Sequence, residues 1–184
     1  MNNYWNPYLE KFNCINHKDF YSYELRSSMV KEFAWAVPNN DAIEAIQALN
    51  KDIIEIGSGS GYWAQVLNEA GRNVIAFDAH IGGYEFTEKW FAVKEGSIEN
   101  IKDHADKALM LCWPNYDESF AFDAAVEYLE NGGDTLIYIG EGHYGCTAND
   151  DFHNLMCKEF NVTTIAIPQW SGIHDYLNIC TRKK

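Results

Sequence analysis

The chain has 184 residues and a formal net charge of −13, from 27 acidic and 14 basic side chains. Its hydrophobic content of 47%, with 15% aromatic residues, excludes a disordered chain, and its length suits one domain with a sizeable core. The acidic balance disfavours a nucleic-acid partner, because proteins that bind nucleic acids neutralise phosphates with Lys and Arg. A small molecule or a protein partner fits this charge better, although an acidic protein can still carry a local basic patch.

The cysteines and the apolar runs indicate a compartment. Five cysteines are scattered along the chain, odd in number and never in Cys-x-x-Cys spacing. This usage indicates reduced thiols and predicts neither a disulfide framework nor a metal site. Charged or amide residues interrupt every apolar run, and the first residues lack the basic and apolar regions of a signal peptide. We therefore expect a cytoplasmic protein without a membrane span.

The first 50 residues are rich in aromatic side chains and contain two expected helices. One covers about 20–34, and Asn39, Asn40 and Asp41 supply N-cap residues for the second, which runs to Leu49. We expect residues 1–50 to form a helical, aromatic extension of a single domain, 1–184, and to lid its pocket.

A glycine turn follows the first apolar run of the domain. Residues 53–56 lead directly into Gly57-Ser58-Gly59-Ser60-Gly61, which predicts a buried strand at about 52–56, a tight turn and a helix at about 62–71. Glycines let backbone amides approach a ligand where a Cβ would collide. A second strand, at about 73–77, ends in Asp78, whose carboxylate is placed to accept hydrogen bonds from both hydroxyls of a ribose. The pattern indicates a nucleoside-type cofactor.

The spacing of the turn argues against a dinucleotide cofactor such as NAD. The dinucleotide fingerprint Gly-x-Gly-x-x-Gly/Ala needs a small residue at its sixth position, for close packing of helix on strand. That position holds the bulky Tyr62, and the third glycine comes one place early. Glu55, two places before the first glycine, is also foreign to the dinucleotide pattern. An NAD-dependent oxidoreductase is therefore the weaker alternative.

Further elements alternate between strand and helix after the turn. Gly82-Gly83 opens a loop, and Gly96-Ser97 caps a helix. The other expected elements are a short strand at 90–93, helices near 98–106, 117–130 and 150–159, and strands at 108–112, 134–139, 162–167 and 176–181. This alternation predicts an α/β fold with a parallel sheet and helices on both faces. Because no helix separates the last two strands, we expect them to pair antiparallel.

The motif from Glu55 to Gly61, Glu-x-Gly-x-Gly-x-Gly, resembles motif I of the class I S-adenosylmethionine (SAM) methyltransferases. The resemblance implies a Rossmann-like fold with a seven-stranded, mostly parallel sheet and an antiparallel last strand. It also implies SAM as cofactor, with S-adenosylhomocysteine as product. In that family the acid lies near the methionine ammonium group. The cofactor-binding residues that we expect are Glu55, Gly57, Ser58, Gly59, Gly61, Asp78, Ser97, Cys112 and Trp113.

A second stretch, 112–116, lies at the position of motif IV, which reads Asp/Asn-Pro-Pro-Tyr/Phe in amino-group methyltransferases. Here Trp113 stands where the polar residue belongs and Asn115 replaces the second proline, which argues against amine methylation of nucleobases. Core packing is one interpretation of Trp113 and Tyr116. The other is an aromatic face beside the sulfonium, which would add a cation–π attraction of about 0.5–2 kcal/mol.

Two loops carry the candidate catalytic residues. The strand at 134–139 runs into a glycine-rich loop with Glu141 and His143, and the loop before the last strand carries His174. These three are candidate bases, with Tyr116 to orient the acceptor; solvated turns and a packing role for His174 are the alternatives. A base contributes about 10²–10⁴-fold in rate whereas orientation supplies about 7–11 kcal/mol, so methyl transfer does not require one.

Five stretches, at 33–38, 55–63, 111–114, 138–141 and 172–175, together resemble a group of uncharacterised methyltransferase-like proteins over roughly residues 30–182. The resemblance implies a SAM-dependent methyltransferase acting on a small-molecule or protein acceptor. A SAM-binding module that assists a partner without catalysis stays open, because Trp113 replaces the polar residue of motif IV.

Overall fold

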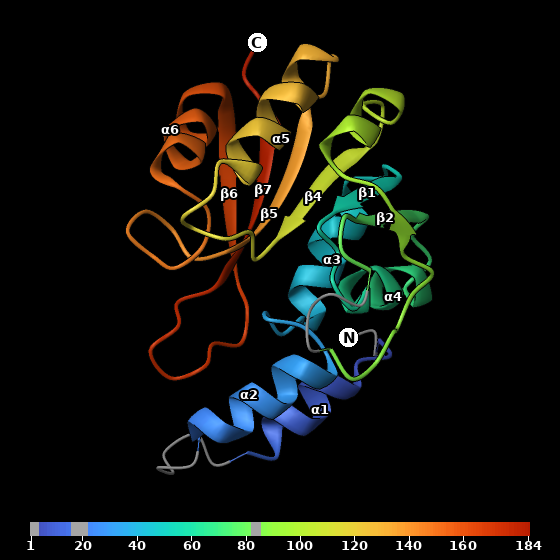
Figure 1. Ribbon diagram of the computed structural model, residues 1–184, viewed down its shortest axis with the longest axis vertical. Helices are drawn as coiled ribbons and strands as arrows, with labels where there is room; N and C mark the ends of the chain where they lie inside the picture. Colours follow the sequence, from blue (N-terminus) through green and yellow to red (C-terminus); the bar gives the residue numbers. More distant parts are fainter. Residues whose placement is uncertain (1–3, 16–21, 82–85) are drawn as a thin grey trace.

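The computed structural model describes residues 4–15, 22–81 and 86–184, so the expected loop at Gly82-Gly83 lies outside the described residues. Seven strands form one sheet in the order β3-β2-β1-β4-β5-β7-β6 (Figure 1). Their bounds are β1 Ile53–Ile56, β2 Val74–Asp78, β3 Lys94–Glu95, β4 Ala108–Cys112, β5 Thr135–Gly140, β6 Phe160–Ala166 and β7 Tyr176–Arg182. Strands β1 to β5 pair in parallel, and β7 pairs antiparallel with both β5 and β6. The predicted sheet, with its antiparallel ending, is confirmed.

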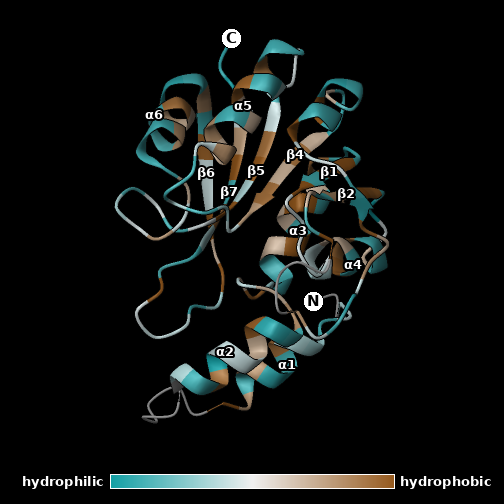
Figure 2. Ribbon diagram, in the orientation of Figure 1, coloured by the Kyte–Doolittle hydropathy of each residue, from teal (hydrophilic) through white to brown (hydrophobic). Residues whose placement is uncertain are grey.

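Helices cover both faces of the sheet. α3 (Asn40–Ala48) and α4 (Tyr62–Glu69) lie on one face, and α5 (Phe120–Glu130), α6 (Asp150–Glu159) and the 3₁₀ segment η1 (Ile98–Asp103) lie on the other (Figure 1). Because side chains alternate along a strand, Ile53 packs in the core layer with α3 and α4, and Ile54 packs in the layer with α5, α6 and η1. The apolar residues gather on the strands and on the inner sides of the helices (Figure 2). No helix within the described ranges is long and apolar enough to cross a membrane.

Two N-terminal helices, α1 (Pro7–Asn13) and α2 (Ser22–Glu32), lie below the carboxyl ends of the central strands (Figure 1). A buried hydroxyl fixes α1 to the domain, because the Tyr62 hydroxyl accepts the backbone N–H of Tyr8 and donates to Asn6 Oδ1, both at 3.0 Å. Rings then extend the contact: Tyr8 stacks on Phe33 with centroids 4.8 Å apart, and the edge of Phe33 packs on Tyr62 of the domain at 5.1 Å. The bulky residue that breaks the dinucleotide fingerprint is therefore the anchor of the N-terminal segment.

The third strand differs from the prediction. It is the two-residue β3 at Lys94–Glu95, whereas the sequence places a strand at 90–93. Trp90 is used elsewhere: its backbone N–H donates to Ser60 O at 2.9 Å, and its indole N–H donates to Glu32 O at 2.7 Å. Trp90 therefore packs the glycine turn against the N-terminal helices, and residues 90–93 pair with no strand in the described part of the chain. The helix expected near 98–106 is the shorter 3₁₀ segment η1.

Candidate functional site

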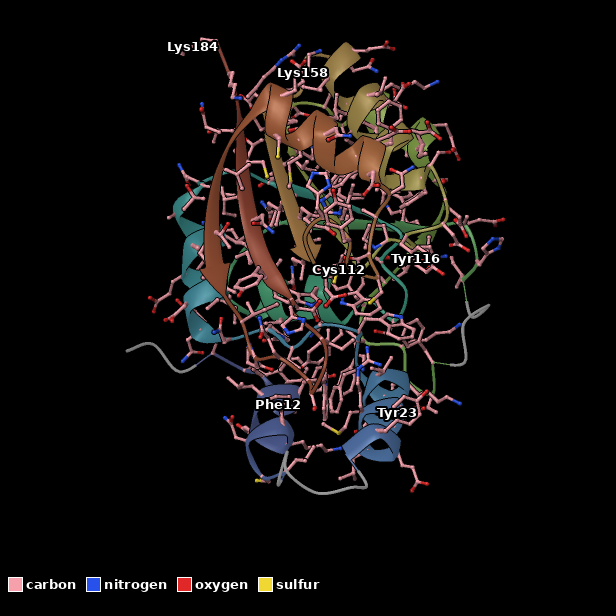
Figure 3. All side chains as sticks on the ribbon, turned by 90° about the vertical axis from the view of Figure 1, so that its left-hand side faces the viewer. Phe12, Tyr23, Cys112, Tyr116, Lys158 and Lys184 are labelled. Carbon is pink, nitrogen blue, oxygen red and sulfur yellow. The ribbon has the colours of Figure 1, made fainter. Side chains whose placement is uncertain are left out.

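A cavity of about 310 Å³ lies at the carboxyl ends of the strands, where β1 and β4 are neighbours and the strand order reverses. Open α/β sheets bind ligands at such a point. The cavity is lined by Glu55, Gly57, Ser58, Gly59, Asp78, Ser97, Cys112 and Trp113, together with Trp35, Phe86, Glu118, Phe120 and others. We call it the glycine-turn cavity. Figure 3 shows Cys112 near the middle of the molecule, between the sheet and the N-terminal helices.

The glycine turn has a backbone that side chains would disturb. Gly57, Gly59 and Gly61 all have positive φ, at 73°, 55° and 75°. A Cβ on Gly59 would lie 2.8 Å from the Phe86 ring, and one on Gly61 would lie 2.7 Å from Phe91 Cβ. Gly59 borders the cavity. Gly61 is the N-cap of α4 and packs on Phe91, and it does not line the cavity. Of the expected cofactor residues, Gly61 alone is outside the lining.

Asp78 closes the turn from the end of β2. Its side chain is only 5% exposed, and its Oδ2 accepts the backbone N–H of Gly59 at 2.8 Å. Its Oδ1 accepts the backbone N–H of His80, also at 2.8 Å. The carboxylate is therefore oriented beside the turn. Ser97 lies on the next loop, where its backbone N–H donates to Asn100 Oδ1 at 3.0 Å.

Glu55 is the unusual acid of the cavity. It lies in the middle of β1, is 1% exposed, and its Oε2 is buried without a hydrogen-bond partner in the described structure. Burial, together with the nearby charge of Asp78, raises the pKa of Glu55 to about 8. A buried acceptor without a partner is costly, so a bound cation at this point would remove that cost.

Trp113 forms the wall at the end of β4. Its φ is +55°, a left-handed conformation that is strained for a bulky residue. Its indole N–H donates to Asp175 Oδ1 at 2.8 Å, and its ring stacks on Trp35 with centroids 4.8 Å apart. Burial raises the pKa of the neighbouring Cys112 thiol well above its usual range, which keeps that thiol neutral. Trp113 is thus held on two sides at the cavity.

The expected catalytic residues Tyr116, Glu141 and His174 lie together, but around a different and more open hollow. This hollow, of about 660 Å³, is also lined by His143 and Cys146, and we call it the Glu141 depression. None of the three lines the glycine-turn cavity, although residues 114 and 115 do and so connect the two sites along the chain. Tyr116 is 59% exposed on the rim, to the right of Cys112 in Figure 3.

The contacts of Glu141 favour a positioning role over the role of base that the sequence suggests. Its Oε2 accepts the backbone N–H of Cys146 at 2.7 Å, and its Oε1 accepts the backbone N–H of His174 at 2.6 Å. Burial acts to raise the pKa of Glu141, but these hydrogen bonds outweigh it and leave the pKa below its usual value. A carboxylate that joins two loops and is stabilised in its ionised form is a weak base.

Three further residues at the site were missed by sequence reasoning. Phe86 faces the glycine turn, Asp175 holds Trp113, and Arg26 on α2 lies with its Cζ 5.4 Å from the Trp113 ring. No local pattern marks Arg26 or Phe86, because their contacts join segments that are distant in the sequence.

No protein-family model matches the chain. The fold is similar to 1,6-didemethyltoxoflavin-N1-methyltransferase of Burkholderia thailandensis, solved with 1,6-didemethyltoxoflavin and S-adenosylhomocysteine, with a TM-score of 0.56 and 12% identity over 95% of this chain and 90% of that one. It is also similar to a SAM-dependent methyltransferase from Archaeoglobus fulgidus, with a TM-score of 0.51 and 13% identity over 77% and 93% of the two chains. A protein of the NADB-Rossmann superfamily from Streptococcus agalactiae gives a TM-score of 0.51 and 11% identity over 82% and 72%. The chain therefore has the Rossmann-like fold of the class I SAM-dependent methyltransferases.

Proposed function

We propose that the protein is a SAM-dependent methyltransferase that acts on a small-molecule or protein acceptor. The observation that carries the proposal is Glu55, a buried carboxylate with an unpartnered oxygen at the floor of the glycine-turn cavity. SAM carries a positive ammonium and a positive sulfonium, and an ammonium placed beside Glu55 would supply the missing partner.

The rest of the cavity fits the same cofactor. Asp78 has its carboxylate at the end of β2, where the oxygens would accept hydrogen bonds from the hydroxyls of a ribose. The turn from Gly57 to Gly61 carries no side chain larger than that of serine. Among the described residues, the cavity is lined by three acids, Glu55, Asp78 and Glu118, and by no Lys or Arg. A cationic ligand is favoured by that charge, whereas the pyrophosphate of NAD is not.

Bound SAM would supply a methyl group activated by positive sulfur. The protein itself would then bind the two reactants, orient them and exclude water. Orientation of the reactants alone supplies a large part of the reduction of the activation barrier. The stacked rings of Trp35 and Trp113 form an apolar wall on the cavity. Tyr116 and His174 lie on the rim of the neighbouring Glu141 depression, where they could contact part of an acceptor.

A non-catalytic SAM-binding module is the second candidate, and Trp113 favours it. The indole N–H points to Asp175 and is already used, so it offers no polar group to an acceptor amine. Under this candidate the cavity binds SAM but no methyl group is transferred.

Calorimetric titration with SAM, S-adenosylhomocysteine and NAD tests the proposal. We expect micromolar binding of the first two and none of NAD, with binding weakened in Asp78→Ala and unchanged in the exposed control Asp41→Ala. NAD binding without SAM binding would overturn the proposal. Transfer of labelled methyl from SAM to molecules of a cell extract then separates the enzyme from the non-catalytic module.

A further inference from the structure

A second cavity, of about 300 Å³, lies beside the glycine-turn cavity against helix α2. Its lining is Tyr23, Arg26, Ser27, Val30, Lys31, Trp35 and Phe86, and we call it the α2 cavity. Trp35 and Phe86 line both cavities, so the two cavities meet at these side chains. Figure 3 shows Tyr23 on α2, below the end of β4 at Cys112. A molecule in the α2 cavity would therefore lie next to the proposed cofactor.

The titratable residues that line the two cavities are of opposite kind. Glu55, Asp78 and Glu118 line the first, whereas the α2 cavity is lined by Arg26 and Lys31 and by no acid among the described residues. The chain as a whole has 27 acidic and 14 basic side chains, so an acid-free lining with two cations is a departure from its composition. A cation fits the first cavity, and an anion fits the second.

Arg26 is the group that an anion would meet. Its Nε and Nη2 are buried and have no hydrogen-bond partner in the described structure. The guanidinium lies over two rings, with Cζ 5.5 Å from the centroid of Trp35 and 5.4 Å from that of Trp113. These cation–π contacts hold the side chain but leave its N–H groups unsatisfied. The guanidinium fork matches the two oxygens of a carboxylate or phosphate, which would satisfy them.

The aromatic residues of the lining favour a flat ligand. Three of the residues around the α2 cavity are aromatic, namely Tyr23, Trp35 and Phe86. Flat rings offer large contact areas to a flat ligand, and aromatic pairs attract each other beyond what the buried area supplies.

We propose that the α2 cavity is the acceptor site and that the acceptor is a planar organic anion. Its carboxylate or phosphate pairs with Arg26, its ring lies against Trp35, and its reactive atom reaches the glycine-turn cavity past Trp35 and Phe86. The anion site stands on Arg26 and its surroundings, whereas its assignment to the acceptor rests on the proposed function.

Binding of simple probes tests the inference without an assay of activity. We would titrate the protein, saturated with S-adenosylhomocysteine, with 2-naphthoate, 2-naphthyl phosphate and the neutral 2-naphthamide, and with cyclohexanecarboxylate as an anion without a flat ring. We expect one or both naphthyl anions to bind about tenfold or more tightly than the amide and the saturated anion. The stronger naphthyl anion identifies the headgroup as carboxylate or phosphate.

Variants locate the site. Arg26→Gln should weaken the stronger naphthyl anion about tenfold or more, Arg26→Lys should weaken it less, and the exposed control Lys102→Gln should leave it unchanged. The affinity for SAM should fall less than that for the naphthyl anion in Arg26→Gln, because Arg26 contacts Trp35 and Trp113 but does not itself line the glycine-turn cavity. Circular dichroism shows whether each variant is folded, and Arg26→Lys serves if Arg26→Gln is not.

Three results would overturn the inference: equal affinity for the anions and the amide, no effect of either Arg26 variant on the anions, or a matching loss of SAM affinity in Arg26→Gln. Failure of the proposed function looks different. In that case SAM does not bind, yet the anions bind through Arg26, which overturns the acceptor assignment alone.

Discussion

The indole N–H of Trp113 donates a hydrogen bond to Asp175 Oδ1 at 2.8 Å, across 62 positions of the sequence. It joins the end of β4 to the residue before β7 and fixes a ring whose backbone is strained at φ +55°. Asp175 is 1% exposed, and burial raises its pKa to about 7 despite the hydrogen bond. The pair therefore holds the Trp113 ring in place at the glycine-turn cavity.

Trp113→Phe keeps an aromatic ring and removes the donor. We expect it to lower the free energy of unfolding by about 1–3 kcal/mol, because a buried carboxyl is left without its partner. The cost should be larger at pH 8.5 than at pH 5.5, since Asp175 is ionised above its pKa of about 7. Urea unfolding of Trp113→Phe, Asp175→Asn and the double variant measures the coupling. Equal costs at both pH values and no coupling would contradict the pairing.

Glu55 makes the stability of the unliganded protein depend on pH. Its pKa is about 8 in the folded chain and 4.5 when unperturbed, so the folded state binds more protons between these values. The stability that Glu55 contributes is complete below about pH 4.5 and is lost as the pH rises through 8, with a slope of up to about 1.4 kcal/mol per pH unit. Asp175, whose pKa is also raised, acts in the same direction.

Glu55→Gln should flatten this dependence, because the amide does not titrate. Unfolding by urea between pH 5 and 8.5 measures the slope, and the exposed Glu44→Gln is the matched control that should keep it. A slope in Glu55→Gln that equals the native one would show that Glu55 ionises normally.

A comparison of Gly59 with Gly132 separates the effect of backbone strain from the effect of a collision with Phe86. Gly59 and Gly132 both have positive φ, at 55° and 87°, but a Cβ meets the Phe86 ring at 2.8 Å only at Gly59. Alanine at either position should cost about 1–2 kcal/mol of stability through strain. Only Gly59→Ala should also weaken SAM binding, by about tenfold or more, because Phe86 must move at the cavity. Melting curves and titrations of both variants check this, and native affinity in Gly59→Ala would count against the site.

Tyr62→Phe tests the anchor of the N-terminal helices. The variant removes a buried hydroxyl that bonds Tyr8 N and Asn6 Oδ1, so we expect a loss of about 1–3 kcal/mol and faster hydrogen exchange in α1. Tyr144→Phe is the control, since Tyr144 is 94% exposed and should tolerate the change. Unchanged exchange in α1 would mean that other contacts hold the segment.

Local sequence signals predicted the frame of the site. Gly57, Gly59 and Gly61 specify their turn because each has a positive φ, and Asp78 ends a strand that periodicity alone reveals. The antiparallel ending followed from the missing helix between the last two strands. These features are encoded within a few residues of one another, so a single sequence is enough to find them.

The walls of the site depend on contacts between distant segments, which a single sequence does not reveal. Arg26 meets the rings of Trp35 and Trp113 only because α2 lies below the strands, and the Glu141 carboxylate meets His174 across 33 positions. The third strand was misplaced for a related reason. Trp90 has neighbours in the sequence that favour a strand, but its ring packs in the aromatic cluster around Tyr62.

Titration of SAM at pH 7, in two buffers of different ionisation enthalpy, tests the central claim most directly. If the cofactor's ammonium pairs with Glu55, whose pKa is about 8 without a ligand, binding must ionise that carboxyl and release a proton to the buffer. We therefore predict micromolar binding with release of close to one proton, and weaker binding without that release in Glu55→Gln. An absence of SAM binding, or the same affinity and proton release in Glu55→Gln, would contradict the account.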